Sequence, residues 1–467
     1  MSDAAELMFA GIARQADLVR SGEVSSAELV AASLARIARL DPELNAFRIV
    51  LGERARAEAA QADARRAAGD ERPLLGVPIA IKDVADVAGE VTTHGTAAHG
   101  PPATRDSQLV RRLRAAGAVV VGKTHTPEIA LWGFTESATY GVTRNPWRTD
   151  RTPGGSSGGS GAAVAAGMVG AASASDGLGS IRIPAACCGL FGLKPQRGRV
   201  PLGPDDDHWH GLSVAGVLTR SVIDTALFLD VVADPPGNGA AGGGWLVQAA
   251  RRPPGPLRIV KALNPPAGAR RAGEDMTRAI EETADLLRSL GHEVVDGRID
   301  YGDAVLRATG RMLRGAHDEV AGLSPRRRLE RRTQATARLG SLIPAAAIAR
   351  ERAAEPARAR RLNSVLQGCD VLLMPSMAAP AAEVGTFEGI GALGTLLREG
   401  LRWPGGYTPA WNLSGQPAAA VPAGFDDRGL PLSVQLVGQP DGEAALVSLA
   451  AQIEAERSWT DRRPPVS

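Results

Sequence analysis

The pattern of apolar and polar residues changes character near residue 75. Before that point, Ser25 and Glu28 have the spacing of a helix-capping box, and apolar residues then recur with a helical period up to Ile37. A second stretch, 52–68, is rich in Ala and Arg and is typical of a solvated surface helix. The sequence therefore predicts N-terminal helices over residues 1–70.

From Leu75 onward, short β-branched or apolar runs alternate with helix-like segments. Strands are predicted at 76–81, 118–121, 257–261, 371–374, 418–421 and 432–437. Helices are predicted at 107–116 and 275–290, and a stretch rich in Gly and Pro at 234–244 indicates a long surface loop. This alternation predicts an α/β fold. We expect a single domain over residues 1–467, with 71–233 and 363–467 as two parts of one core.

Composition narrows the classes of protein. The 53 Lys plus Arg nearly balance the 51 Asp plus Glu, which excludes a globally basic nucleic-acid-binding protein and an acidic tail protein. With 44% apolar residues, the chain can bury a large core. It has no run of 18 strongly apolar residues and no signal-peptide pattern, so we expect a cytoplasmic protein without membrane attachment. The three cysteines cannot form a disulfide framework or a four-cysteine zinc site, and no metal is expected.

Positive charge is concentrated in one segment. Residues 307–361 contain 14 Arg and five acidic residues. One interpretation is a peripheral cap of solvated helices over about 300–362, and the other is a site for an anionic partner. Nucleic acid is not supported as that partner, because no aromatic residues are interleaved with the arginines.

One motif is misleading. Residues 117–124 match the phosphate-binding pattern G-x-x-x-x-G-K-[ST], which requires a loop between the two glycines. The intervening residues here are Ala and three Val, which are typical of a strand. We therefore predict no nucleotide site.

The densest candidate chemistry lies between residues 151 and 199. A Gly/Ser tract around Ser156 is followed by a second small-residue segment around Ser180. Adjacent glycines allow several backbone N–H groups to converge on one point, which suits an oxyanion hole with a serine nucleophile at its edge. None of the seven histidines lies in this tract or in a G-x-S-x-G motif. The remaining candidate base is Lys82, which ends an apolar strand and is either a solvated residue or a buried, neutral amine.

Three segments together carry a resemblance to a known family. They are 76–83 with Lys82, 153–160 with Ser156 and 176–184 with Ser180. Lys82 lies 74 residues before Ser156, and Ser156 lies 24 residues before Ser180. The sequence resembles the amidase signature family, whose members use a Ser–cis-Ser–Lys triad. The resemblance covers nearly the whole chain and implies the amidase signature fold, with a large mixed sheet between helices.

By matching position, the resemblance implies Ser180 as nucleophile, Ser156 as a bridging serine preceded by a cis peptide, and Lys82 as the base. Lys82 must then be neutral near pH 7. The oxyanion would be held by the backbone N–H groups of Gly177, Leu178, Gly179 and Ser180. The family usually has two glycines directly before the nucleophile, and here the first is Leu178. A backbone donor survives this change if φ is negative, so we expect activity with a narrower acyl pocket.

Substrate preference is suggested by residue 183. In tRNA amidotransferase subunits of this family a Gln stands there, and Ile183 instead favours an apolar acyl or aryl amide. The candidate pocket residues are Leu131, Trp132, Ile183, Trp403, Tyr407 and Trp411. Ordinary core packing is an equal alternative for the last three.

The resulting hypothesis is hydrolysis of a small-molecule amide without a cofactor. Anilides, carbamates, cyclic amides and esters stay open as substrates. The alternatives are an amide-forming acyltransferase and a glutamine-hydrolysing amidotransferase subunit. An inactive binding protein conflicts with the intact Lys82, Ser156 and Ser180. The oligomeric state, including a homodimer, is left open.

Overall fold

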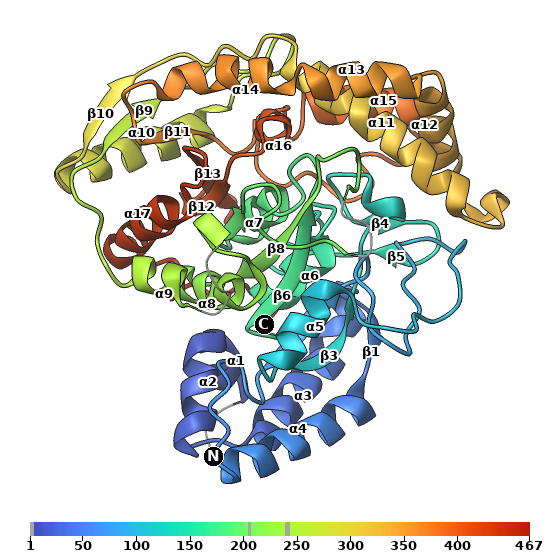
Figure 1. The fold of residues 1–467 in the computed structure, drawn as a ribbon, viewed down its shortest axis with the longest axis vertical. Coiled ribbons are helices and arrows are strands. Elements are labelled where there is room, and N and C mark those ends of the chain that lie inside the picture. Colours follow the sequence, from blue (N-terminus) through green and yellow to red (C-terminus); the bar gives the residue numbers. More distant parts are fainter. Residues whose placement is uncertain (1–3, 204–206, 239–242) are drawn as a thin grey trace.

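Helices form the N-terminal part of the computed structural model, which describes residues 4–203, 207–238 and 243–467 (Figure 1). They are α1 (Ala4–Phe9), α2 (Gly11–Ser21), α3 (Ser26–Leu44) and α4 (Gly52–Ala67). The Ser25 side chain accepts a hydrogen bond from the Glu28 N–H, and the Glu28 carboxylate accepts one from the Ser25 N–H. The predicted capping box and both predicted helices are therefore confirmed.

The first sheet has five strands. In spatial order they are β1 (Phe47–Val50), β3 (Val119–Thr124), β2 (Pro78–Lys82), β6 (Ala171–Asp176) and β8 (Val214–Thr219). β2 runs parallel to β3 and β6, whereas β1 and β8 are antiparallel edge strands. Since β2 and β6 are parallel neighbours, their carboxyl ends, at Lys82 and Asp176, lie at the same edge of the sheet.

The second sheet has six strands and joins distant parts of the chain. In spatial order they are β10 (Glu293–Asp296), β9 (Arg258–Lys261), β11 (Val371–Pro375), β13 (Pro431–Gly438), β12 (Ala418–Phe425) and β7 (Gly192–Lys194). β7 belongs to the segment 71–233 and pairs with β12 of the segment 363–467, so both segments contribute to one sheet. The α/β fold with mixed sheets between helices is confirmed.

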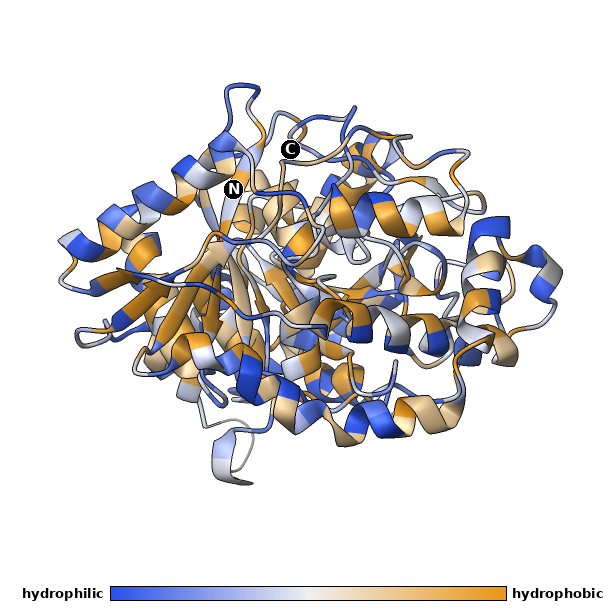
Figure 2. Cartoon of the chain, turned by 90° about the horizontal axis from the view of Figure 1, so that it is seen from above, coloured by the Kyte–Doolittle hydropathy of each residue, from blue (hydrophilic) through white to orange (hydrophobic). Residues whose placement is uncertain are grey.

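An isolated bridge links the two sheets at Phe191 and Thr219, whose N–H and C=O groups exchange hydrogen bonds of 3.1 and 3.4 Å. Regular strand pairing divides the mixed sheet into these two linked parts, of five and six strands. The reason is that β7 has only three residues and pairs with β12 rather than extending along β8. One hydrophobic cluster nevertheless spans both sheets, and apolar residues concentrate on the interior strands (Figure 2).

Further helices cover the sheets. They are α5 (Gln108–Ala115), α6 (Gly158–Ala165), α7 (Arg182–Cys188), α8 (Val222–Val232), α9 (Trp245–Ala250), α10 (Glu274–Ser289), α16 (Pro409–Ser414) and α17 (Glu443–Glu456). A small hairpin pairs β4 (Glu136–Ser137) with β5 (Gly141–Val142). The loop predicted at 234–244 contains a short 3-10 turn at Pro236–Asn238, and its residues 239–242 lie outside the described part of the chain.

The Arg-rich segment is helical and lies over one end of the core, in yellow and orange in Figure 1. Its helices, with one from further along the chain, are α11 (Ala304–Gly322), α12 (Arg331–Ser341), α13 (Ala345–Ala353), α14 (Glu355–Asn363) and α15 (Ala392–Leu401). Several of its arginines are engaged in ion pairs, such as buried Arg311 with Glu355 at 2.5 Å. This pairing favours a structural cap over an open anion site.

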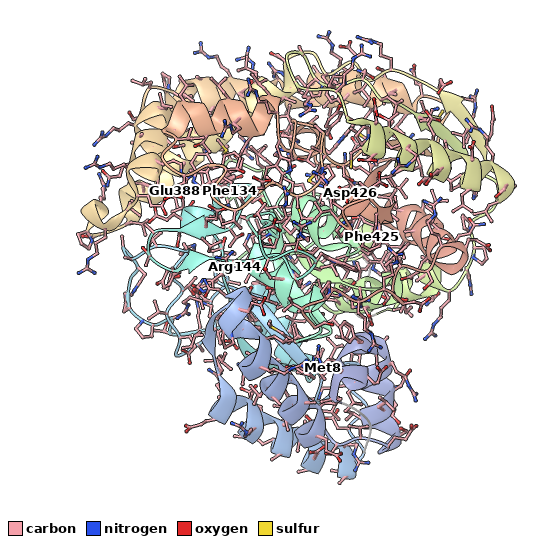
Figure 3. All side chains as sticks on the ribbon, turned by 180° about the vertical axis from the view of Figure 1, so that it is seen from behind. Met8, Phe134, Arg144, Glu388, Phe425 and Asp426 are labelled. Carbon is pink, nitrogen blue, oxygen red and sulfur yellow. The ribbon has the colours of Figure 1, made fainter. Side chains whose placement is uncertain are left out.

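The cap contacts the core where Arg332 packs on an aromatic ring. Phe134, labelled in Figure 3, stacks on Phe387 with ring centroids 4.2 Å apart, and Arg332 of α12 lies over the Phe134 ring at 4.9 Å.

None of the helices that the structure describes is both long enough and apolar enough to cross a membrane.

The phosphate-loop pattern is part of a strand, as predicted. Residues 119–124 form β3, whose residues are all buried. The Lys123 ammonium forms a buried ion pair with Asp83 at 2.7 Å, so its charge is already matched within the protein. No phosphate cradle can form there, because the strand directs its N–H groups to β1 and β2.

Candidate active site

Lys82 is the last residue of the buried strand β2. Its side chain is 1% exposed, and its Nζ lies 2.7 Å from Ser156 Oγ and 2.9 Å from Ser175 Oγ. The Lys82 backbone N–H donates to Ser173 Oγ at 2.8 Å, which links the end of β2 to β6. Of the two interpretations of Lys82, the structure therefore shows the buried one.

The protonation of Lys82 follows from its surroundings. Burial lowers the pKa of Lys82 to about 7, against the opposing effect of the Asp176 and Glu319 carboxylates. A substantial fraction of this amine is therefore neutral at physiological pH, and a neutral amine can accept a proton. Its direct contacts make the hydroxyls of Ser156 and Ser175 the groups able to deliver one.

Ser156 lies in the glycine tract just before α6. The peptide bond between Gly155 and Ser156 is cis. A Cβ added at Gly155 would lie only 2.6 Å from Trp132 O and Phe134 N, so glycine is required for this close backbone approach. The tract is thus a packed part of the site and not a linker.

Asp176 and Arg182 brace the turn that carries Ser180 between β6 and α7. Both side chains are fully buried, and Arg182 Nη2 lies 2.9 Å from Asp176 Oδ1. Arg182 also donates to Asn412 Oδ1 and Gln435 Oε1. Burial raises the pKa of Asp176, but the Arg182 guanidinium outweighs this effect and holds that pKa below its usual range.

One of the four predicted oxyanion donors is already occupied, which corrects that prediction. The Gly179 N–H donates to Asp176 Oδ1 at 2.6 Å. Within the described chain, the N–H groups of Gly177, Leu178 and Ser180 donate to no protein atom. Leu178 does not have a positive φ, so its backbone keeps the conformation that an L-residue prefers. Three donors are therefore available beside Ser180.

Ser180 opens onto a cavity, which we call the acyl cavity, between this turn, α11 and α15. Its hydroxyl has no hydrogen-bond partner among the described residues, so the structure shows no hydrogen bond between Ser180 and Ser156. Catalytic hydrogen bonds commonly tighten only when substrate is bound. Apolar side chains dominate the lining, including Leu131, Trp132, Leu178, Ile183, Trp209 and Met312.

Three of the six predicted pocket residues do not line this cavity. Trp403, Tyr407 and Trp411 are at most 6% exposed and pack in the core. Trp403 Nε1 donates to Pro380 O at 2.8 Å, and the Tyr407 hydroxyl accepts from the Ala272 N–H at 3.0 Å. Their clustering in sequence reflects packing behind the cavity, which is the alternative that the sequence left open.

The structure instead adds residues that the sequence did not single out. Trp209 forms part of the wall, and the Thr408 hydroxyl donates to Leu178 O at 2.6 Å, which fixes the oxyanion turn. Met312 of α11 and Glu399 of α15 come from the cap. No local motif marks these positions, since only tertiary packing brings them to Ser180.

A second cavity, the rear cavity, lies on the other side of Lys82. Its polar lining includes Lys82, Ser175, His94, His208 and Glu319. Glu319 lies 3.5 Å from His208 Nε2 and 3.8 Å from His94 Nδ1, and it accepts a hydrogen bond from Trp209 Nε1 at 3.2 Å. Burial raises the pKa of Glu319, but His208 and His94 outweigh it and lower that pKa.

This arrangement can be compared with known proteins. The sequence model of the Amidase family matches residues 28–447, which is most of the chain. The chain belongs to the amidase signature family. The resemblance seen in the sequence is thereby confirmed, and this member of the family is an amide hydrolase.

Relatives of this amidase extend over its full length. A protein of Mycobacterium tuberculosis named AmiB2 is 50% identical over 467 residues, which is 100% of each chain. The solved structure of a 6-aminohexanoate cyclic dimer hydrolase is 32% identical, covers 98% of this chain and 99% of its own, and superposes with a TM-score of 0.88. A bacterial aryl acylamidase of the amidase signature family is 25% identical, covers 95% and 96%, and gives a TM-score of 0.84.

Proposed function

We propose that this amidase hydrolyses the C–N bond of a small amide with an apolar or aryl acyl group, through an acyl-enzyme on Ser180. One observation carries the proposal. The strand-end Lys82, whose pKa burial lowers to about 7, hydrogen-bonds Ser156, and Ser180 lines a largely apolar cavity. These features support a proton relay behind a serine nucleophile.

The mechanism follows from these contacts. Neutral Lys82 takes the Ser156 proton, Ser156 takes the Ser180 proton, and Ser180 Oγ attacks the substrate carbonyl. The N–H groups of Gly177, Leu178 and Ser180 would stabilise the oxyanion. Ser156 then returns a proton to the leaving amine, and water attacks the ester through the reverse relay to release the acid.

The class of substrate follows from the cavity lining. Leu131, Trp132 and Ile183 present apolar surface beside Ser180, which favours hydrophobic acyl groups. Leu178 occupies space in the same cavity, in agreement with a narrow acyl site. The names of two structural neighbours, an aryl acylamidase and a cyclic dimer hydrolase, support aryl or aliphatic amides.

The first test is covalent labelling with a fluorophosphonate, followed by peptide mass spectrometry. We expect the label on Ser180, and Ser180→Ala should abolish both labelling and hydrolysis of a panel of acyl anilides. The matched control is Ser160→Ala, because Ser160 is a buried serine of the same tract that hydrogen-bonds Ser173 O and Thr124. A label on another residue would refute the assignment.

The second test separates hydrolysis from acyl transfer. The enzyme is given an anilide with and without added hydroxylamine, and the acid and hydroxamate products are quantified. Formation of the acid as the main product in the presence of moderate hydroxylamine supports a hydrolase. Hydroxamate as the dominant product at low amine concentration would identify an acyltransferase instead.

A further inference from the structure

One ionisable side chain, apart from the reacting groups, lines the otherwise apolar acyl cavity within the described chain. It is Glu399, near the end of α15. Glu399 is partly exposed within the cavity. A carboxyl group placed among apolar side chains is unfavourable unless it is solvated, paired or performs a function. The mechanism proposed above makes no use of Glu399, so its position needs a separate explanation.

Only one of the two oxygens of the Glu399 carboxyl group has a hydrogen-bond partner in the part of the chain that the structure describes. Glu399 Oε1 accepts a hydrogen bond from the Gly133 N–H at 2.7 Å. Its other oxygen has no hydrogen-bond partner among residues 4–203, 207–238 and 243–467, and none of the arginines, lysines or histidines described there lies within 4 Å of the carboxyl. Glu399 therefore has a free acceptor oxygen and no counter-charge.

The electrostatics agree with this geometry. Burial raises the pKa of Glu399 to about 8, although the Gly133 N–H and the Arg332 guanidinium act in the opposite direction. Arg332 itself pairs with Glu330 at 3.1 Å and lies over the rings of Trp132 and Phe134. It is therefore committed elsewhere and does not neutralise Glu399.

Glu399 lies a short acyl chain away from the reacting carbonyl. A Cβ added at Gly133 would lie 3.1 Å from Glu399 Oε1 and 3.7 Å from Ile183 Cδ1, and one added at Gly179 would lie 2.9 Å from the same Ile183 atom. A single side chain thus separates the carboxyl from the oxyanion turn. Because these contacts lie in series, Glu399 Oε1 is at most about 10 Å from the Cβ position of Gly179. An extended ω-amino chain of about five or six carbons, advancing about 1.25 Å per bond, spans this distance when the hydrogen bond of its ammonium is included.

We propose that Glu399 selects amides whose acyl chain ends in an ammonium group, about five or six carbons from the scissile carbonyl. The alkyl part would pack against Ile183 and the apolar walls. The ammonium would favour the ionised form of Glu399 and lower the pKa of that carboxyl, so that the two groups form an ion pair in the bound state. A divalent cation fits less well, because it requires several oxygen ligands and the cavity offers one carboxyl group. This inference rests on the proposed function of Ser180.

The test compares two matched series of p-nitroanilides. One series has ω-amino acyl groups of four to eight carbons, and the other has alkyl acyl groups in which a methyl replaces the ammonium. For the wild-type enzyme we expect a higher kcat/KM for the amino series, by about 10- to 100-fold at the best chain length. That length should be about five or six carbons.

Two variants locate the effect. Glu399→Gln keeps a carbonyl oxygen for the Gly133 N–H and cannot ionise, so it should abolish the preference for the amino series over the alkyl series. The control Thr309→Val changes another polar residue of the same cavity, whose hydroxyl donates within α11 to Val305 O. It should alter both series together and preserve their ratio.

The outcomes distinguish the two proposals. If the alkyl anilides are hydrolysed and Ser180 is labelled, but the wild-type enzyme does not prefer the amino series, the inference about Glu399 is wrong and the proposed function stands. The same holds if Glu399→Gln retains the preference. If neither series is hydrolysed and Ser180 is not labelled, the proposed function fails, and the inference fails with it.

Discussion

The two cavities on either side of the catalytic candidates differ in character. The acyl cavity beside Ser180 has apolar walls, and Glu399 is its one carboxyl group among the residues described. The rear cavity beside Lys82 also has apolar lining residues, such as Leu109 and Leu202, but it contains more polar and ionisable groups, among them serines, two histidines, Asp86 and Glu319. They share a partition, because Leu131 and Trp209 face the acyl cavity whereas their chain neighbours Ala130 and His208 face the rear one.

The difference shows how the nucleophile and its base can have different surroundings in one active site. A hydrophobic acyl group requires an apolar site around the nucleophile. The base requires hydrogen-bond partners that hold its amine in place, together with burial that favours its neutral form. Placing Ser180 and Lys82 on opposite sides of the partition lets each keep its own environment.

The largest effect expected from breaking this arrangement comes from removal of the base. Lys82→Ala should lower kcat/KM by about 10²- to 10⁴-fold, because Ser156 then has no proton acceptor. Combining it with Ser156→Ala should add little, since members of one relay act as a unit. Steady-state kinetics with an anilide substrate measure both effects.

Lys261→Ala is the control for this loss. Lys261 is a buried lysine of the second sheet, ion-paired with Glu281 and remote from the serines. It should leave kcat/KM nearly unchanged. Partial rescue of Lys82→Ala by added small alkylamines would support proton transfer, whereas wild-type activity in Lys82→Ala would exclude Lys82 as the base.

Effects of intermediate size are expected from substituting two tryptophans, one that lines the acyl cavity and one that is buried in the core. Trp411 is fully buried, and Trp411→Ala should lower the free energy of unfolding by about 3–5 kcal/mol without changing the ranking of acyl groups. Trp209→Ala should change that ranking by about 10-fold between small and bulky acyl groups, because Trp209 lines the cavity. Urea unfolding and a substrate panel separate the two. Equal rankings in both variants would show that Trp209 does not contact the acyl group.

The smallest effect concerns the pH profile. The pKa of Lys82 is about 7, so kcat/KM should fall as the pH drops below 7 and Lys82 becomes protonated. The Glu319 carboxylate favours the charged amine, and Glu319→Gln should therefore move the midpoint to lower pH, by less than about one pH unit. His94 and His208 face the same carboxylate, so His94→Gln serves as the comparison variant. A midpoint that shifts upward in Glu319→Gln would contradict this role of Glu319.

Local patterns predicted the local parts of the structure. The capping box at Ser25 and the strand that ends at Lys82 each depend on neighbours within a few residues, and both are present. The apparent phosphate loop was rejected for the same reason, since Ala and Val between its glycines favour a strand. The three candidate catalytic residues were found because their motifs are specific to a family.

The substrate site could not be predicted in the same way. Trp403, Tyr407 and Trp411 are close in sequence, but burial of each ring depends on strands and loops far along the chain. Glu399 reaches the cavity from α15 of the cap, and Trp209 reaches it from a loop before β8. Such contacts depend on tertiary structure, and no periodicity in the sequence encodes them.

Helix α11 contributes to both cavities from a single stripe. Val305, Thr309 and Met312 line the acyl cavity, and Glu319, two turns beyond Met312, lines the rear one. At 1.5 Å per residue, the stripe from Val305 to Glu319 is a rod about 21 Å long. If α11 tilted about its middle, it would narrow one cavity and widen the other. If it slid along its axis, the residues that line both cavities would shift together. A shift of α11 as a rigid unit would therefore move the Met312 side of the acyl cavity and the Glu319 carboxylate near Lys82 together.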